Sequence, residues 1–173
     1  MTRRRKNREQ AVAPESAALT DFWEEQIRIH GRRLFFVDTG GILKALERDE
    51  TFVDFFDSIV GEQLITSTYV LAEVVRRIVK SDNPGRFIGP SGERGTTLAV
   101  YVLTAWIQSN RVRVICPPEQ VFHAAKNEFV RNQGIGCDLV DVISFVIVVG
   151  LQQNRIVSAD RHFRSLGLVC YPG

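Results

Sequence analysis

Leu34-Phe35-Phe36-Val37-Asp38-Thr39 is the stretch of sequence from which the fold can be predicted. Its first four residues are a continuous apolar run of aromatic and β-branched types, which is typical of a strand buried on both faces. The run ends at the carboxylate of Asp38, and open parallel sheets bind ligands at the carboxyl ends of their strands. Asp38 therefore has two interpretations here, either as part of a ligand site or as the N-cap of the helix that follows.

Strands and helices are predicted to alternate along the rest of the chain. Beyond the first strand, apolar spacing predicts helices after Asp38 and again from Thr51, and a second strand at 64–66. Later strands are expected at 111–115, 155–158 and 168–171, and helices at 70–80, 98–108, 119–133, 139–152 and 161–166. This alternation predicts an α/β fold, a three-layer α/β/α sandwich with a central parallel sheet, formed by residues 34–173.

Two further segments precede this domain. Residues 1–15 are polar, charged and without periodicity, which indicates a flexible basic arm. Residues 16–33 are expected to form a helical extension that packs on the surface of the domain, because Phe22, Trp23 and Ile27 fall at helical spacing.

Composition limits the classes of protein to consider. The chain is 45% apolar and 24% charged, as in an ordinary soluble globular protein, and the run at 142–151 is far shorter than the ~20 residues that span a bilayer, so no membrane partner is expected. Three cysteines without a CxxC pair argue against a disulfide scaffold or structural zinc and fit a cytoplasmic protein.

The positive charge is concentrated at the start of the chain. Residues 1–10 contain five basic residues and one acid, Glu9, so this segment is more positive than the whole chain, whose net charge is +2. Such an arm either contacts nucleic acid or is a solvated terminus.

Four acidic residues fall where this fold would bring them together. Asp38 and Asp160 follow predicted strands, and Glu73 lies early in the helix after the second strand. Because parallel strands of one polarity end at the same edge of a sheet, these three carboxylates are expected to meet there. Asp141, in the first turn of the most apolar helix, joins them if that helix begins at the same edge. A cluster of carboxylates is stable when a cation neutralises it, and oxygen ligands suit Mg²⁺ or Mn²⁺.

Each acid near a helix start also has a simpler explanation. Glu73 can pair with Arg77 four residues later, and Asp141 can be a second capping acid after Asp138. His162, beside Asp160, either contacts a substrate or occupies a surface position in a short helix.

Four short motifs, in this order and spacing, resemble those of the PIN domain family, and within it the VapC-type toxins. They are residues 36–39 (FVDT), 66–73 (TSTYVLAE), 139–145 (LVDVISF) and 158–163 (SADRHF). The resemblance implies an α/β/α sandwich and a Mg²⁺- or Mn²⁺-dependent ribonuclease. It also implies frequent homodimers and, for toxins, a cognate antitoxin protein that inhibits the site.

The resemblance assigns roles to particular residues. It implies that the catalytic residues and metal ligands are the same four acids: Asp38, Glu73, Asp141 and Asp160. The hydroxyls of Thr39 and Ser158 match positions that help to order the site.

The sequence thus supports one main hypothesis, a metal-dependent endoribonuclease that hydrolyses RNA phosphodiesters and is the toxin of a toxin–antitoxin pair. The long segment before residue 34 and the long loop at 81–96 depart from compact toxins, so a PIN nuclease of RNA processing or turnover without an antitoxin stays open. The same pattern also admits a non-catalytic module that binds RNA or protein, and a metal-dependent phosphatase. The phosphatase is disfavoured because no DxD motif follows the first strand.

Overall fold

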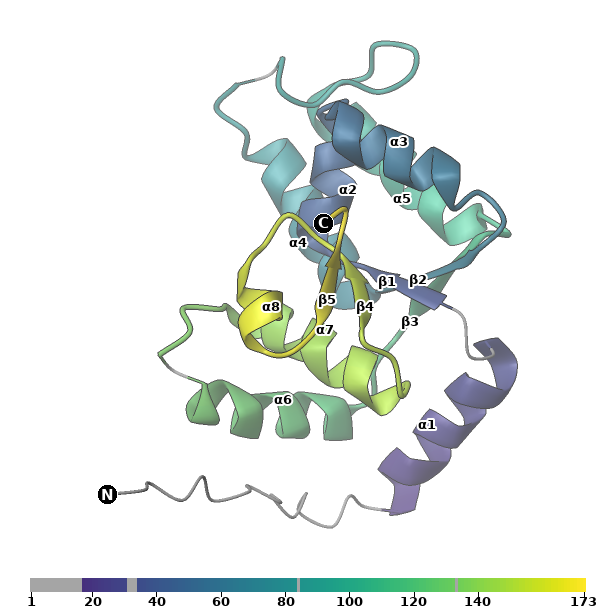
Figure 1. Ribbon diagram of the computed structural model, residues 1–173. Helices are drawn as coiled ribbons and strands as arrows, with labels where there is room; N and C mark the ends of the chain where they lie inside the picture. The colour runs from purple at the N-terminus through teal and green to yellow at the C-terminus, as the bar shows by residue number, and fades with distance from the viewer. Residues whose placement is uncertain (1–16, 31–33, 84, 133) are drawn as a thin grey trace.

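The computed structural model describes residues 17–30, 34–83, 85–132 and 134–173. The predicted arm at 1–15 lies outside the described residues. Within them, strands form one sheet in the order β3-β2-β1-β4-β5, and each neighbouring pair is parallel. Helices cover both faces of this sheet (Figure 1), so the α/β/α sandwich with a central parallel sheet is confirmed.

The first strand lies at the centre of the sheet, between β2 and β4, and all four of its residues are buried. Its continuous apolar run predicted this burial on both faces. The strand predicted at 111–115 is the edge strand β3, where Arg113 is exposed. The strands are β1 Leu34–Val37, β2 Gln63–Ser67, β3 Val112–Ile115, β4 Arg155–Val157 and β5 Val169–Tyr171.

Helices α2 to α5 connect β1 to β2 and β2 to β3, and α6 and α7 return the chain across the sheet to β4. Right-handed crossovers place these two groups on opposite faces (Figure 1). The strand order therefore changes direction between β1 and β4, where α/β folds bind ligands. The helices are α1 Ala17–His30, α2 Thr39–Leu46, α3 Glu50–Ser58, α4 Thr68–Val79, α5 Gly95–Gln108, α6 Glu119–Arg131, α7 Leu139–Gly150 and α8 His162–Ser165.

Some helix ends differ from the sequence prediction. Helix α3 begins at Glu50, with Asp49 at its N-cap position, rather than at Thr51, and α5 begins at Gly95 rather than at 98. Helix α7 ends at Gly150 rather than at 152, because Gln152 adopts a left-handed backbone conformation with φ of 56°. None of these shifts moves an acid of the predicted site. No helix in the described ranges is long and apolar enough to cross a membrane.

The amphipathic helix predicted from Phe22, Trp23 and Ile27 is α1, and it packs on the domain through Trp23. The Trp23 ring is buried and lies directly over Gly150 at the end of α7, where a Cβ atom would overlap the indole. Leu19, one turn earlier, is buried as well. Helix α1 thus packs against α7 at Gly150, where the absence of a side chain leaves room for the Trp23 ring.

Two consecutive glycines let α2 begin in close contact with β4. A Cβ atom on Gly41 would overlap the carbonyl oxygen of Val157, and one on Gly40 would lie 3.2 Å from the Ser158 hydroxyl. The absence of side chains at both positions brings Asp38, the residue before α2, to the end of β4.

We expect Gly41→Ala to destabilise the protein by about 1–3 kcal/mol, because the added methyl group must push α2 away from backbone atoms that cannot rotate aside. Urea denaturation of the variant measures this. Gly61→Ala is the matched control, since no atom lies within 4 Å of a Cβ at Gly61. Equal stability of the two variants would contradict the close approach described above.

Candidate active site

Asp38 lies at the carboxyl end of β1 and is only 2% exposed. It is the N-cap of α2, and its Oδ2 accepts a hydrogen bond from the Gly40 N–H at 3.3 Å. The hydroxyls of Ser144 and Ser158 donate to its two carboxylate oxygens, at 3.3 and 3.2 Å. The N-cap interpretation of Asp38 is therefore confirmed. This residue also lies where the strand order reverses, and its role in a ligand site stays a prediction.

Burial of this carboxylate has an electrostatic consequence. Desolvation raises the pKa of Asp38 from 3.8 to about 6, and the hydrogen bonds from backbone N–H groups and from the two serines offset only part of that rise. The partners of Asp38 are neutral donors, so no cationic side chain is among the groups that stabilise its charge.

Asp141 lies in the first turn of α7 and takes part in a capping box. Its N–H donates to Asp138 Oδ1 at 3.0 Å, and its own Oδ2 accepts from the Asp138 N–H at 2.9 Å. The interpretation of Asp141 as a second capping acid is thus confirmed. The capping box contains no cation, so it does not neutralise the negative charge of Asp141. Burial first, and then the negative charges of Asp38, Asp138 and Asp160, raise the pKa of Asp141 to about 7.

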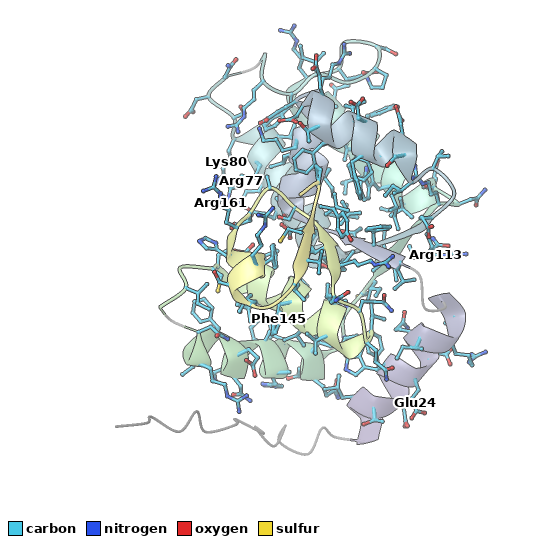
Figure 2. All side chains as sticks on the ribbon, viewed as in Figure 1. Glu24, Arg77, Lys80, Arg113, Phe145 and Arg161 are labelled. Carbon is cyan, nitrogen blue, oxygen red and sulfur yellow. The ribbon has the colours of Figure 1, made fainter. Side chains whose placement is uncertain are left out.

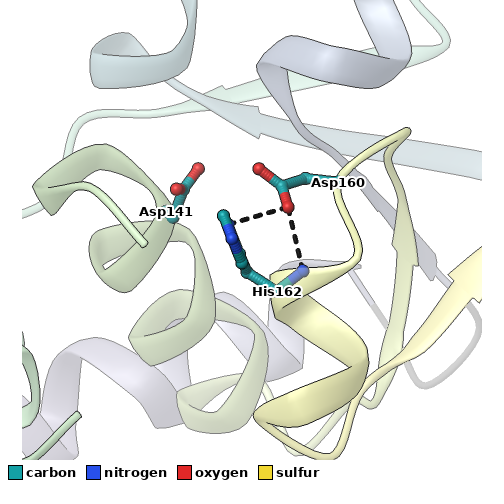
Figure 3. A group of neighbouring side chains, drawn as sticks. All are labelled: Asp141, Asp160 and His162. Atoms are coloured by element: carbon teal, nitrogen blue, oxygen red, sulfur yellow. Dashed lines mark hydrogen bonds and ion pairs between the residues drawn. The ribbon is translucent and has the colours of Figure 1, made fainter. Parts of the chain in front are cut away.

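Asp160 follows β4 and is held by the same serine that contacts Asp38. Its N–H donates to Ser158 Oγ at 3.0 Å, and its Oδ1 accepts from the backbone N–H of His162 at 2.9 Å. Figure 3 shows Asp141, Asp160 and His162 pointing toward one another from α7, from the loop after β4 and from α8. One ligand atom from each lies within 4.8 Å of the others, which is close enough for one cation to bind all three.

Glu73 lies on α4, which packs against α7, but it is not one of these three residues. Arg76 binds both of its carboxylate oxygens at 2.5 and 2.6 Å, and Arg77 binds Oε1 at 2.7 Å. These arginines, Arg76 first, lower the pKa of Glu73. The pairing with Arg77 that the sequence spacing suggested is therefore present, and the role of Glu73 as a metal ligand stays a prediction.

The pKa of Arg76 is raised mainly by its hydrogen bonds and charge interaction with Glu73, and to a smaller extent by the charge of Asp138. Figure 2 shows the side chains of Arg77, Lys80 and Arg161 projecting at the same side of the molecule. Basic side chains from α4 and from the start of α8 therefore lie on one side of the molecule.

A pocket of about 400 Å³ opens beside Asp160, the one acid of the predicted site among its lining residues, which also include Ser158, Arg161 and Arg164. Sequence reasoning did not predict this pocket. It also did not select Ser144, although a buried hydroxyl in the most apolar helix needs a polar partner, and this could have marked the residue.

Comparisons with known proteins identify the family. A sequence model of the PIN domain matches residues 35–168. No curated protein sequence matches the chain. Among solved structures, the sarcin-ricin loop cleaving toxin VapC20 of Mycobacterium tuberculosis is 21% identical, with a TM-score of 0.64 over 78% of this chain and 96% of that one.

Two further structures align over similar lengths. VapBC2 from Rickettsia felis, solved with a DNA fragment from its promoter, is 12% identical with a TM-score of 0.55. FitAcB from Neisseria gonorrhoeae is 14% identical with a TM-score of 0.51, and both alignments cover 79% of this chain and 96% of the other. At such identities these likenesses show a shared fold. Since the family match spans most of the chain and includes all four predicted acids, the chain belongs to the PIN domain family.

Proposed function

We propose that this protein is a metal-dependent endoribonuclease that hydrolyses RNA phosphodiester bonds with Mg²⁺ or Mn²⁺. The observation that carries the proposal is that Asp141 and Asp160 lie within reach of one cation, while Asp38, at the point where the strand order reverses, is near enough for its charge to raise the pKa of Asp141. A stable fold gains nothing from placing like charges together, whereas a cation site requires it.

The residues present fit a hard divalent cation. Their donors are carboxylate oxygens, and the pKa values of Asp38 and Asp141 are raised to about 6 and about 7, so a cation would displace protons that the cluster otherwise binds. The buried hydroxyl of Thr39, next to Asp38, has no hydrogen-bond partner among the described residues. When bound at these acids, Mg²⁺ or Mn²⁺ supplies an activated water and charge stabilisation for the leaving oxygen of a phosphodiester.

The other residues of the site position these ligands and the substrate. Ser144 and Ser158 orient the Asp38 carboxylate, and the capping box fixes Asp141 at the start of α7. We assign Glu73 as the fourth acid, held by Arg76 and Arg77 until a cation or a substrate phosphate competes for its partners. Arg161 and Arg164, which line the adjoining pocket, are suited to contact RNA phosphates.

The partner that we assign to this nuclease is an antitoxin protein, as for a toxin of the VapC type. The likeness to VapC20, VapBC2 and FitAcB supports this assignment at the level of the fold. An apolar pocket of about 330 Å³, lined by residues of α3 and α5 such as Val53, Phe56 and Trp106, offers a surface for a protein partner or a second copy of the chain. The cysteines are free, which fits a cytoplasmic location.

A PIN nuclease of RNA processing or turnover, without an antitoxin, is the second candidate. The observation that favours it is helix α1, which is seated on α7 through Trp23 as part of the folded unit. The aligned toxin chains are matched over 96% of their length, whereas 78–79% of this chain is matched.

RNA cleavage by the purified protein tests the proposed activity. We expect cleavage of structured RNA in Mg²⁺ or Mn²⁺, no cleavage in EDTA, and recovery when excess cation is added. Asp160→Asn should lower the rate by about 100-fold or more, because it removes a charged ligand from the site. Asp54→Asn, on an exposed position of α3, is the matched control and should retain full activity.

Two other outcomes would replace the proposal. Tight RNA binding without cleavage in either metal would identify a non-catalytic module. Hydrolysis of a small phosphoester such as p-nitrophenyl phosphate, with intact RNA, would identify a phosphatase.

A further inference from the structure

His162 lies in the acid cluster, and its two ring nitrogens face different surroundings. Nδ1 is 2.9 Å from Asp160 Oδ1. Nε2 faces the loop before α7, where a Cβ atom on Gly136 would lie 3.7 Å from it. The side chain is 38% exposed overall, but the Nδ1 atom itself is enclosed.

The contact between Nδ1 and Asp160 has the distance of an ion pair without the geometry of a hydrogen bond. Within the described residues, Nδ1 has no hydrogen-bond partner despite the carboxylate oxygen 2.9 Å away. That oxygen already accepts the backbone N–H of His162 at 2.9 Å. In the tautomer that carries its proton on Nε2, the Nδ1 lone pair faces the carboxylate oxygen at this distance, and the two repel unless a cation lies between or beside them.

Coordination geometry accounts for this spacing. Ligands on adjacent corners of an octahedron with bonds of about 2.1 Å are about 3 Å apart, close to the separation of Nδ1 and Oδ1. Asp141 supplies a third ligand atom, since one ligand atom from each of the three residues lies within 4.8 Å of the others. Asp160 and His162 are two residues apart, on the loop after β4 and at the start of α8, whereas Asp141 comes from α7, so the fold brings Asp141 to this local pair (Figure 3).

We propose that His162 binds the same cation as Asp141 and Asp160, through Nδ1, and that this nitrogen ligand makes the site favour Mn²⁺ over Mg²⁺. Imidazole suits first-row transition metals, whereas Mg²⁺ prefers oxygen ligands and holds its waters. The inference rests on the proposed function only in that the cluster binds a divalent cation. It adds a ligand that the four-acid pattern does not contain.

Electron spin-echo spectroscopy of the full-length protein loaded with Mn²⁺ tests this ligand directly. We expect modulation from a directly coordinated ¹⁴N nucleus in the wild-type protein and its loss in His162→Ala. His123→Ala is the matched control, because His123 also faces a carboxylate, that of Glu119 at 3.3 Å, but lies on α6 outside the cluster. That variant should keep the signal.

Equilibrium dialysis supplies a second readout. His162→Ala is expected to weaken Mn²⁺ binding about 10-fold and Mg²⁺ binding by less than about 3-fold. Bound Mn²⁺ without ¹⁴N modulation, or an equal loss of affinity for both metals, would overturn the role of His162. If RNA is still cleaved in that case, the nuclease proposal stands alone. Conversely, ¹⁴N coupling to bound Mn²⁺ without RNA cleavage would support His162 as a metal ligand and contradict the proposed nuclease activity.

Discussion

Asp38→Asn is expected to raise the stability of the metal-free protein at neutral pH while lowering RNA cleavage by about 100-fold or more. The two effects have one cause. The carboxylate is buried among neutral hydrogen-bond donors, so its charge destabilises the fold unless a cation is bound. Asparagine removes the charge with almost no change in shape. It also removes the anionic ligand on which the proposed chemistry depends.

The size of the stability gain follows from the pKa. A rise from 3.8 to about 6 corresponds to about 2–3 kcal/mol that the folded state loses when Asp38 is ionised. The amide can keep the existing contacts, because its oxygen accepts from the Gly40 N–H while its NH₂ group donates to the Ser144 hydroxyl, which can act as an acceptor. We therefore expect a gain on the order of 2 kcal/mol.

Urea denaturation at about pH 7.5 in EDTA measures the gain, and cleavage of RNA in Mg²⁺ measures the loss of activity. Asp54→Asn controls for removing one negative charge at an exposed position, and it should change neither quantity appreciably. A less stable Asp38→Asn protein would mean that the ionised carboxylate is needed by the fold itself, and it would weaken the case for a cation site.

Asp38 also shows why the centre of this fold could be predicted from sequence. An apolar run without polar interruptions has to be covered on both faces, and alternation with helices makes the sheet parallel, so the carboxyl end of that strand lies at the ligand edge. Asp141 and Asp160 could be placed near this edge for the same reason, because one lies at the start of a helix and the other just after a strand.

Glu73 and His162 show where such prediction stops. An acid followed by Arg76 and Arg77 can turn toward either arginine or toward the sheet edge, and only side-chain rotamers decide between them. The position of His162 depends on how α8 is oriented after a short loop, which no periodicity encodes. The close approach of Gly41 to Val157 is likewise a contact between distant segments that the sequence of neither one predicts.

The second large effect concerns pH. We expect the metal-free protein to become less stable as the pH rises from about 5 to about 8. In the folded state the pKa values of Asp38 and Asp141 are about 6 and about 7, above the 3.8 of an unperturbed aspartate. Between these values the folded state binds more protons than the unfolded state, so the free energy of unfolding falls with rising pH and levels off above about pH 8.

The decrease should be on the order of 2 kcal/mol, most of it from Asp38, because solvent screens the more exposed Asp141. Glu73, whose pKa is lowered, has the opposite effect, but only at a pH below its unperturbed value of 4.5, outside this range. Urea denaturation in EDTA at several pH values measures the slope. The double variant Asp38→Asn, Asp141→Asn should flatten it.

Adding Mg²⁺ should reverse this trend, because a cation binds the ionised carboxylates and competes with their protons. Stabilisation by saturating Mg²⁺ is therefore expected to be small near pH 5 and to grow until about pH 8. A stabilisation by Mg²⁺ that is equal at all pH values would place the ion away from Asp38 and Asp141. Stability of the metal-free protein that rises through this range would show that both aspartates are ionised without difficulty, and the physical reason for placing a cation among them would be lost.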